Sequence, residues 1–197
     1  MKDIAILLLA AGKSSRMNGI KQLLKVNHKT LLEITIDKVK ALKNSTVFCV
    51  LGANANRIQK EINTNELKYI INPNYNEGLS SSIIAGLRHV NTNAHSYKGL
   101  FIILADQPAI SSTYLAKMIA IFNNNTSKIV ASNYQGKAGV PAIFPYIYFK
   151  KLLKITGDKG AKELLKKNEK DIIFCNLPTN LVDIDTPEDY LNYLNSI

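Results

Sequence analysis

Runs of apolar residues alternate along the chain with stretches whose apolar positions recur at helical spacing. Continuous apolar runs, typical of buried strands, lie at 4–9, 46–52, 68–72, 99–106 and 128–132. Helical spacing is found between them, at 29–42, 55–62, 79–90 and 112–123, with Ser111 or Ser112 as a cap for the last helix. Strands separated by helices form parallel sheets. The pattern therefore predicts an α/β protein with a mostly parallel sheet flanked by helices.

The pattern loosens in the second half of the chain. Residues 140–144 fit a strand or a loop, helical stretches lie on both sides of 156–160, and the runs 171–177 and 181–184 resemble strands. A C-terminal helix is predicted to start at Pro187, with Thr186 as its cap. Since no repeat or linker marks a boundary, residues 1–197 are treated as one domain.

Composition narrows the class of protein. The sequence is 46% apolar and 20% charged, which is ordinary for a globular domain, and its apolar runs are too short to span a membrane. Its net charge of +10 comes from 25 Lys and Arg residues, of which 22 are Lys, whereas nucleic-acid recognition favours Arg. The two cysteines, Cys49 and Cys175, lie in strand-like runs and fit reduced core thiols. We expect a cytoplasmic protein that binds neither membrane nor nucleic acid.

The first strand leads into a loop of small and basic residues, "AAGKSSR", at 10–16. It is not a phosphate-binding P-loop, because that motif needs a glycine where Leu7 stands, and the GxGxxG fingerprint is absent as well. The loop nevertheless follows a strand end, where open α/β sheets bind ligands. With Arg16 and Lys21 it predicts an anion site; the alternative is a solvated basic loop.

Carboxylates follow two of the predicted strands. Asp106 ends the most apolar strand, while Asp183 and Asp185 alternate on the predicted strand 181–184 and would point to opposite faces, so that only one can join Asp106. Asp185 is the better candidate, and a plain turn or cap is the alternative for each acid. Two carboxylates, a cationic loop and no catalytic triad favour Mg²⁺ bound together with phosphate oxygens, as in phosphoryl or nucleotidyl transfer.

A fourth stretch, "NEGLSSSIIAGL" at 76–87, places Gly78, Ser80 and Ser81 at a helix start. Free N–H groups and hydroxyls at such a position can bind polar edges of a ligand. Ordinary capping by one of the serines is the alternative.

Six segments in order, "LLAAGKSSRMNGIKQLL", "NEGLSSSIIAGL", "LADQP", "GKAGVPAIF", "TGDKGAKELL" and "VDIDTPEDY", together resemble the MobA-like nucleotidyltransferase superfamily. The resemblance implies a Rossmann-like fold and transfer of a nucleoside monophosphate from an NTP·Mg²⁺ complex to a phosphorylated acceptor, whose phosphate attacks directly. It assigns Arg16, Lys21 and Asp106 to catalysis, and Asp106 and Asp185 to the metal. The nucleotide would contact Leu9, Ala10, Ala11, Gly12, Arg16, Lys21, Gly78, Ser80 and Ser81.

Within the superfamily the chain is most similar to the molybdenum cofactor cytidylyltransferase branch. This implies CTP as donor, molybdopterin as acceptor and a molybdenum hydroxylase as partner. Guanylyltransferases of the superfamily typically read "LAGG" where this chain has "LAAG", so Ala11 favours cytosine. Asn18 replaces a usual Gly, and Val140 replaces the usual His of "GHP", which bears on the acceptor. The rivals are a sugar or polyol phosphate as acceptor, and a non-catalytic cofactor chaperone.

Overall fold

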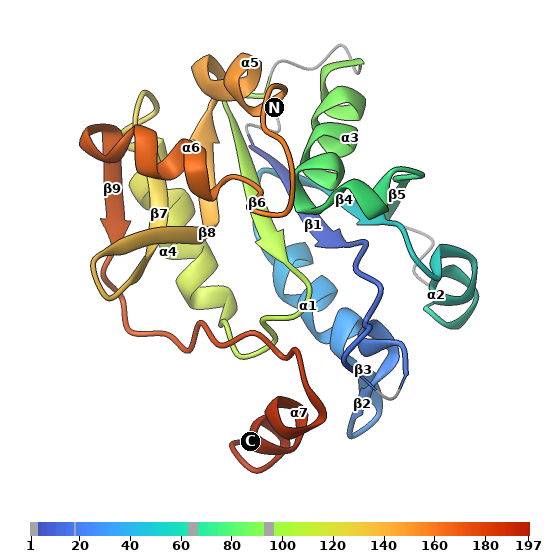
Figure 1. Cartoon of the computed structure of the whole chain (residues 1–197). Helices are drawn as coiled ribbons and strands as arrows, with labels where there is room; N and C mark the ends of the chain where they lie inside the picture. Colours follow the sequence, from blue (N-terminus) through green and yellow to red (C-terminus); the bar gives the residue numbers. More distant parts are fainter. Residues whose placement is uncertain (1–3, 18, 63–66, 93–96) are drawn as a thin grey trace.

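A seven-stranded sheet forms the centre of the protein, whose computed structural model describes residues 4–17, 19–62, 67–92 and 97–197 (Figure 1). Its order is β5-β4-β1-β6-β8-β7-β9, and β8 alone runs antiparallel to its neighbours in it. The strands are β1 (Ile4–Ala10), β4 (Ser45–Leu51), β5 (Lys68–Ile71), β6 (Gly99–Leu104), β7 (Ile129–Tyr134), β8 (Lys137–Pro145) and β9 (Ile172–Cys175). The mostly parallel α/β sheet predicted from the sequence is confirmed.

Helices cover both faces of this sheet. One face packs on α1 (Leu31–Lys40), α2 (Ala55–Glu61) and α4 (Ser112–Asn123), and the other on α3 (Leu79–Thr92), α5 (Phe149–Leu152) and α6 (Lys162–Lys167). Successive β1 side chains serve opposite faces, Leu8 the first and Leu7 the second, which is why β1 reads as a continuous apolar run. Smaller elements are β2 (Lys25–Val26), β3 (Lys29–Thr30), α7 (Pro187–Leu194) and 3₁₀ turns at 21–23, 75–77, 146–148 and 169–171.

Local capping explains where several helices begin. Thr30 caps α1 and Thr186 caps α7, each in a reciprocal arrangement with the acidic residue three positions later, and Ser111 caps α4. The caps predicted at Thr186 and Ser111 are therefore confirmed. The described part of the chain contains no helix that is long and apolar enough to cross a membrane. Cys49 and Cys175 are both free and buried, as predicted.

The chain order across the sheet creates a crevice beside β1. From β1 the chain builds β4 and β5 on one side and then crosses over to β6 on the other side, with Leu9 paired opposite Leu104. Ligands of open α/β sheets bind at the carboxyl end of such a switch point. The loops that follow β1 and β6, which carry Lys21 and Asp106, meet there.

The prediction of a strand at 181–184 is wrong. This segment forms no ladder; Ile184 N donates to Asp106 O at 2.8 Å, and Gln107 Nε2 donates to Leu181 O at 3.2 Å. The side chain of Ile184 is buried beside Val26 and anchors the segment to the protein. The apolar Ile184 between Asp183 and Asp185 is therefore explained by this one buried contact, and not by the alternation of apolar and polar residues along a strand.

Two further expectations concern the second half and the first loop. The segment 140–144 belongs to β8, which is longer than predicted and antiparallel, and α5 and α6 confirm the helices on both sides of 156–160. Asn18, the departure from the family pattern in the first loop, lies outside the described residues.

Candidate functional site

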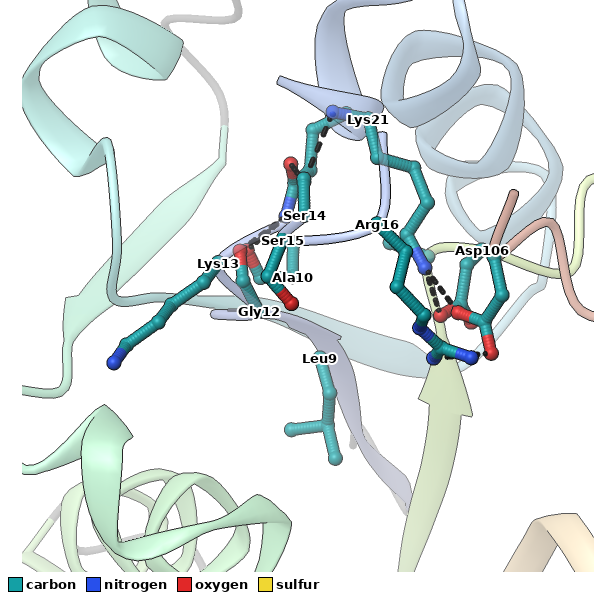
Figure 2. Close-up of a pocket in the computed structure, with 12 residues that line it drawn as sticks. Leu9, Ala10, Gly12, Lys13, Ser14, Ser15, Arg16, Lys21 and Asp106 are labelled. Atoms are coloured by element: carbon teal, nitrogen blue, oxygen red, sulfur yellow. Dashed lines mark hydrogen bonds and ion pairs between the residues drawn. The ribbon is translucent and has the colours of Figure 1, made fainter. Parts of the chain in front are cut away.

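A cavity of about 260 Å³ opens at the crevice, between the loop after β1, the end of β6 and the segment before α7 (Figure 2). Of the residues that the sequence analysis assigned to catalysis or metal, it brings together Arg16, Lys21, Asp106 and Asp185. Its full lining is Leu9, Ala10, Gly12, Lys13, Ser14, Ser15, Arg16, Lys21, Gln22, Ala105, Asp106 and Asp185. We call it the phosphate cavity.

Gln22 holds the loop that forms one wall of the phosphate cavity. Its side chain is buried, and Nε2 donates to Ala10 O at 2.9 Å and to Gly12 O at 3.2 Å. Ser14 Oγ donates to Gln22 Oε1 and accepts from Lys21 N at 3.0 Å, while the backbone of Ser14 is left-handed, with φ 58°. Because these bonds link both ends of the loop, the loop is shaped without a ligand.

Lys21 lies between the two acids. Its Nζ is 2.7 Å from Asp106 Oδ2 and 2.9 Å from Asp185 Oδ1, and Arg16 donates to the other oxygen of Asp185 at 2.9 Å. Figure 2 shows Lys21 reaching Asp106, while Lys13 points away from this pair. The geometry therefore concentrates two cations and two carboxylates at one point of the crevice.

These contacts set the charges of the groups involved. Burial acts to lower the pKa of Lys21, but the charges and hydrogen bonds of Asp106 and Asp185 outweigh it and raise that pKa. Burial acts to raise the pKa of Asp185, but Lys21 and Arg16 outweigh it and hold that pKa below its usual value. Both groups are charged near neutral pH.

Only one of the two carboxylate oxygens of Asp106 makes a hydrogen bond within the described residues. Its Oδ1 is buried and has no hydrogen-bond partner among the described residues, a costly state for a carboxylate oxygen. No group of three or more His, Cys, Asp or Glu side chains in the described ranges is placed to hold a metal. Mg²⁺ often binds through only one or two carboxylates plus substrate phosphates, so Asp106 and Asp185 fit it.

A second cavity of about 400 Å³, which we call the base cavity, adjoins the first and shares Leu9, Gly12, Lys13 and Asp106 with it. Ala11 lies in its wall, and Lys13 Nζ is 5.9 Å from the centre of the Tyr75 ring. A Cβ added to Gly52 would lie 2.9 Å from that of Ala11 and 2.5 Å from that of Tyr75, so only glycine lets β4 end this close to the loop.

The three serines at the start of α3 have different surroundings. α3 begins at Leu79, so no serine is its cap, and Ser80 and Ser81 line neither cavity. Ser80 is buried; its N–H donates to Gly157 O at 3.1 Å, and its Oγ has no hydrogen-bond partner among the described residues. Ser82 lines the base cavity and accepts from Asn72 Nδ2 at 3.0 Å.

Gly78 lies in the wall of the base cavity, as expected for a nucleotide contact. Its backbone has φ 93° and ψ 179°, a region open almost only to glycine. An added Cβ would lie 2.4 Å from Asp158 Oδ1 and 2.7 Å from the backbone of Gly157. Gly78 therefore lets the loop at 156–160 close on the start of α3.

Asp183 does not join Asp106 and Asp185 in the phosphate cavity. It lies on the exposed rim of a third cavity beside Gln107. Protein atoms that displace part of its water, together with the charge of Asp106, raise the pKa of Asp183 to about 6. The expectation that only one of the two acids accompanies Asp106 holds, although its stated reason, a strand, is wrong.

Three residues of the site were missed from the sequence. Gln22 stands between Lys21 and Leu23, Asn72 occurs in "NPN", and Asp158 belongs to the "TGDKG" segment. Next to Lys21, Gln22 looks like an ordinary surface residue in the sequence, so its buried hydrogen bonds give no local signal. Asn72 contacts Ser82, and Asp158 lies beside Gly78, so both act on residues that are separated from them in the sequence, which no local pattern reveals.

Comparisons with known proteins agree with this geometry. The chain is 26% identical over 198 residues to nicotine blue oxidoreductase of Paenarthrobacter nicotinovorans, covering 95% of this chain and 94% of the relative. It is 24% identical over 197 residues to the molybdenum cofactor cytidylyltransferase of Escherichia coli K12, covering 97% and 95%. A manganese complex of Rv0371c from Mycobacterium tuberculosis superposes with a TM-score of 0.82 at 24% identity, covering 99% and 100%.

The match to a known protein family covers most of the chain. Residues 6–172 match the MobA-like NTP transferase domain. This stretch contains the loop after β1, Asp106 and the β7–β8 hairpin. The chain belongs to the MobA-like NTP transferase family.

Proposed function

We propose that this protein transfers CMP from CTP to molybdopterin, with release of pyrophosphate. The observation that carries the proposal is Lys21 Nζ held within 3 Å of both Asp106 and Asp185 at the switch point of the sheet. A lysine and two carboxylates gathered at the carboxyl edge of the parallel strands β1 and β6 suit a reaction that needs phosphate charge neutralised and oriented.

In the proposed reaction an acceptor phosphate oxygen forms a bond to the α-phosphorus of CTP. The bond from that phosphorus to the bridging oxygen of the β-phosphate breaks, and pyrophosphate leaves with the electron pair. Lys21 and Arg16, which pair with carboxylates in this structure, donate to the triphosphate oxygens and stabilise the charge on the leaving group. No protein nucleophile is required, in agreement with the lack of a triad in the sequence.

Asp106 and Asp185 would hold the divalent cation, for which Mg²⁺ is the expected ion. The bound ion would supply charge neutralisation to the phosphates. Support comes from the buried, unpartnered Oδ1 of Asp106 and from the manganese bound in the related mycobacterial structure.

Separate observations support the choice of nucleobase and of acceptor. Ala11 lies in the wall of the base cavity, where the methyl group narrows the space for a base and favours the single ring of cytosine. The cytidylyltransferase relative favours molybdopterin. The relative named as an oxidoreductase matches over a similar length, so family membership alone does not identify the substrate.

The direct test is to incubate the purified protein with Mg²⁺, each of the four NTPs in turn and molybdopterin, and to follow pyrophosphate release. We expect release only when acceptor is present, and fastest with CTP. Glucose 1-phosphate and ribitol 5-phosphate replace molybdopterin in parallel reactions. Turnover with one of these alone would move the chain to a sugar or polyol branch of the family.

A binding protein without catalysis is the competing function. It would bind the cofactor and give no pyrophosphate with any NTP, and it would have no need of Lys21 between two carboxylates. A molybdenum hydroxylase that receives the product stays a prediction, as does a cytoplasmic location. Co-purification of such an enzyme with the tagged protein would test the first.

A further inference from the structure

The segment between β9 and α7 brings Asp185 to the phosphate cavity without forming a helix or strand of its own. It covers residues 176–186 and runs along the edge of the sheet at which β6 and β9 end (Figure 1). Much of it faces solvent, and Leu177 and Val182 are 39% and 60% exposed. Since an irregular and largely exposed segment has little packing of its own, a few specific contacts must fix its position.

Two consecutive residues after β6 provide two of these contacts. Ile184 N donates to Asp106 O at 2.8 Å, and Gln107 Nε2 donates to Leu181 O at 3.2 Å. The first bond joins backbone atoms, whereas the second depends on the side chain at position 107. Because the two bonds hold both ends of the stretch 181–184, they place Asp185, the next residue, beside Asp106.

The surroundings of Gln107 fix the orientation of its amide. The side chain is 2% exposed, and Nε2 also donates to Tyr134 Oη at 2.8 Å. Tyr134 Oη donates to Val140 O, and the Leu181 carbonyl can only accept, so both neighbours of Nε2 are acceptors. Gln107 Oε1 has no partner among the described residues. An apolar residue of the same shape would avoid the cost of that buried oxygen, so the use of the amide lies in its donor.

The side-chain partners of Asp185 are the groups that the proposed function assigns to the triphosphate. In this structure Lys21 and Arg16 hold the Asp185 carboxylate. A bound NTP would draw both cations toward its own oxygens. The burial of Ile184 and the two bonds to residues 106 and 107 then remain to keep Asp185 in place.

We propose that Gln107 is a positioning residue of the transfer reaction: its amide holds the stretch 181–184 so that Asp185 stays beside Asp106 when metal and triphosphate bind. The inference rests on the metal-binding role of Asp185 in the proposed function and adds a residue that acts through Asp185. Groups that orient a metal ligand commonly contribute about 10- to 100-fold to metal affinity. An amide that only satisfied the polar groups of its neighbours would contribute to stability and leave metal affinity unchanged.

The first measurement follows the segment in the protein without metal or nucleotide. The backbone N–H of Ile184 reports on the segment, because it donates to the carbonyl of Asp106. Gln107→Met keeps the approximate shape and removes the donor, so hydrogen exchange at Ile184 should become about fivefold faster or more, as expected for loss of one hydrogen bond of ordinary strength. Unchanged exchange of the β1 and β6 amides shows that the sheet of the variant is intact.

A double-mutant cycle on Mn²⁺ affinity tests whether Gln107 acts through Asp185. Calorimetric titrations with Mn²⁺, without nucleotide, compare the wild type, Gln107→Met, Asp185→Asn and the double variant. Gln107→Met should weaken Mn²⁺ binding about tenfold or more in the wild-type background. In the Asp185→Asn background it should have less than about a twofold effect, because the charged ligand that it positions is already lost.

Asn176→Ala is the matched control. Asn176 Oδ1 accepts from Asn133 Nδ2 at 3.4 Å, so this change removes a side-chain amide contact at the other end of the same segment. It should change neither hydrogen exchange at Ile184 nor Mn²⁺ affinity, and effects as large as those of Gln107→Met would contradict the inference. Gln107→Leu is a second apolar variant, which should reproduce the effects of Gln107→Met.

Wild-type hydrogen exchange at Ile184 in both apolar variants overturns the inference. Faster exchange with unchanged Mn²⁺ affinity overturns it as well, because Gln107 then acts on stability alone, and so does an equal loss of affinity with and without Asp185→Asn. If Asp185→Asn weakens Mn²⁺ binding and Gln107→Met does not, only the inference fails. If Asp185→Asn binds Mn²⁺ as the wild type does, the metal assignment in the proposed function fails, and the inference fails with it.

Discussion

The two sides of the crevice are held together by different interactions. On the β1 side, charged and amide groups from distant segments pair directly: Gln22 ties the loop, and Lys21 bridges Asp106 and Asp185. On the β8 side, aliphatic side chains of regular elements provide a surface, and Val140 is typical of it. Each polar group on the first side is one of few, so its loss removes a function, whereas the second side is a surface to which many aliphatic side chains contribute.

Asp106→Asn should produce the largest effect and would break the charged side directly. The change keeps the shape but removes a charged oxygen ligand, and loss of outer partners alone commonly costs about 10- to 100-fold, so transfer should fall by more than about 100-fold. Pyrophosphate release measures it. Asp171→Asn, which removes a surface carboxylate paired with Lys128, is the matched control and should retain activity. Near-normal turnover of Asp106→Asn at saturating Mg²⁺ would contradict the metal assignment.

Lys21→Ala should raise KM for CTP and lower kcat, reducing kcat/KM by about 10- to 100-fold, the range expected for a lost charged hydrogen bond. In the absence of nucleotide, the same substitution should strengthen the binding of the metal ion. Removal of the ammonium leaves Asp106 and Asp185 without their shared cation, so Mn²⁺ should bind about tenfold more tightly in a calorimetric titration.

Lys128→Ala is the control for this change, because Lys128 pairs with Asp171 on the surface. It should alter neither kinetics nor Mn²⁺ binding. If Lys21→Ala behaves like Lys128→Ala in both measurements, Lys21 is not part of the site.

Gly78→Ala tests the close approach between the two sides. The left-handed backbone disfavours any side chain, and the new methyl would also meet Gly157 and Asp158, so we expect a loss of at least about 2 kcal/mol in the free energy of unfolding. Gly136→Ala separates the two causes, since Gly136 has a similar φ of 87° but nothing within 4 Å of an added Cβ. It should cost only about 1 kcal/mol.

Urea denaturation of both variants measures the difference. Equal losses for Gly78→Ala and Gly136→Ala would mean that the loop at 156–160 does not press on the start of α3.

Ala11→Gly should have the smallest effect and sharpens the assignment of the base. The wild-type protein should prefer CTP to GTP by about tenfold or more in kcat/KM, the size of effect that a misfit of this kind produces. The glycine variant should relax this preference without inverting it, because Ala11 is only 7% exposed and one methyl is not the whole filter. Equal wild-type affinity for CTP and GTP by calorimetry would contradict a base cavity that favours cytosine.

Sequence reasoning succeeded where local pattern and topology act together. The parallel α/β sheet followed from apolar runs separated by helices, and the loops that carry Lys21 and Asp106 meet because β1 and β6 are parallel and end at one edge. It failed where contacts between distant segments decide the structure. The direction of β8 and the position of Ser80 against Gly157 depend on pairing between distant segments.

The turn of the β7–β8 hairpin is a position at which the chain can accept inserted residues. Its two-residue turn, Gln135 and Gly136, has φ values of 52° and 87°. Added residues in a surface turn change the folding free energy little, since the entropy of loop closure grows slowly with length. The loops after β1 and β6 that carry Lys21 and Asp106 would be unaffected, while the surface beside Lys137 would be remodelled. Insertion at this turn can therefore change the surface beside Lys137 while the arrangement of Lys21 and Asp106 stays constant, which makes Gln135–Gly136 the natural site for redesign.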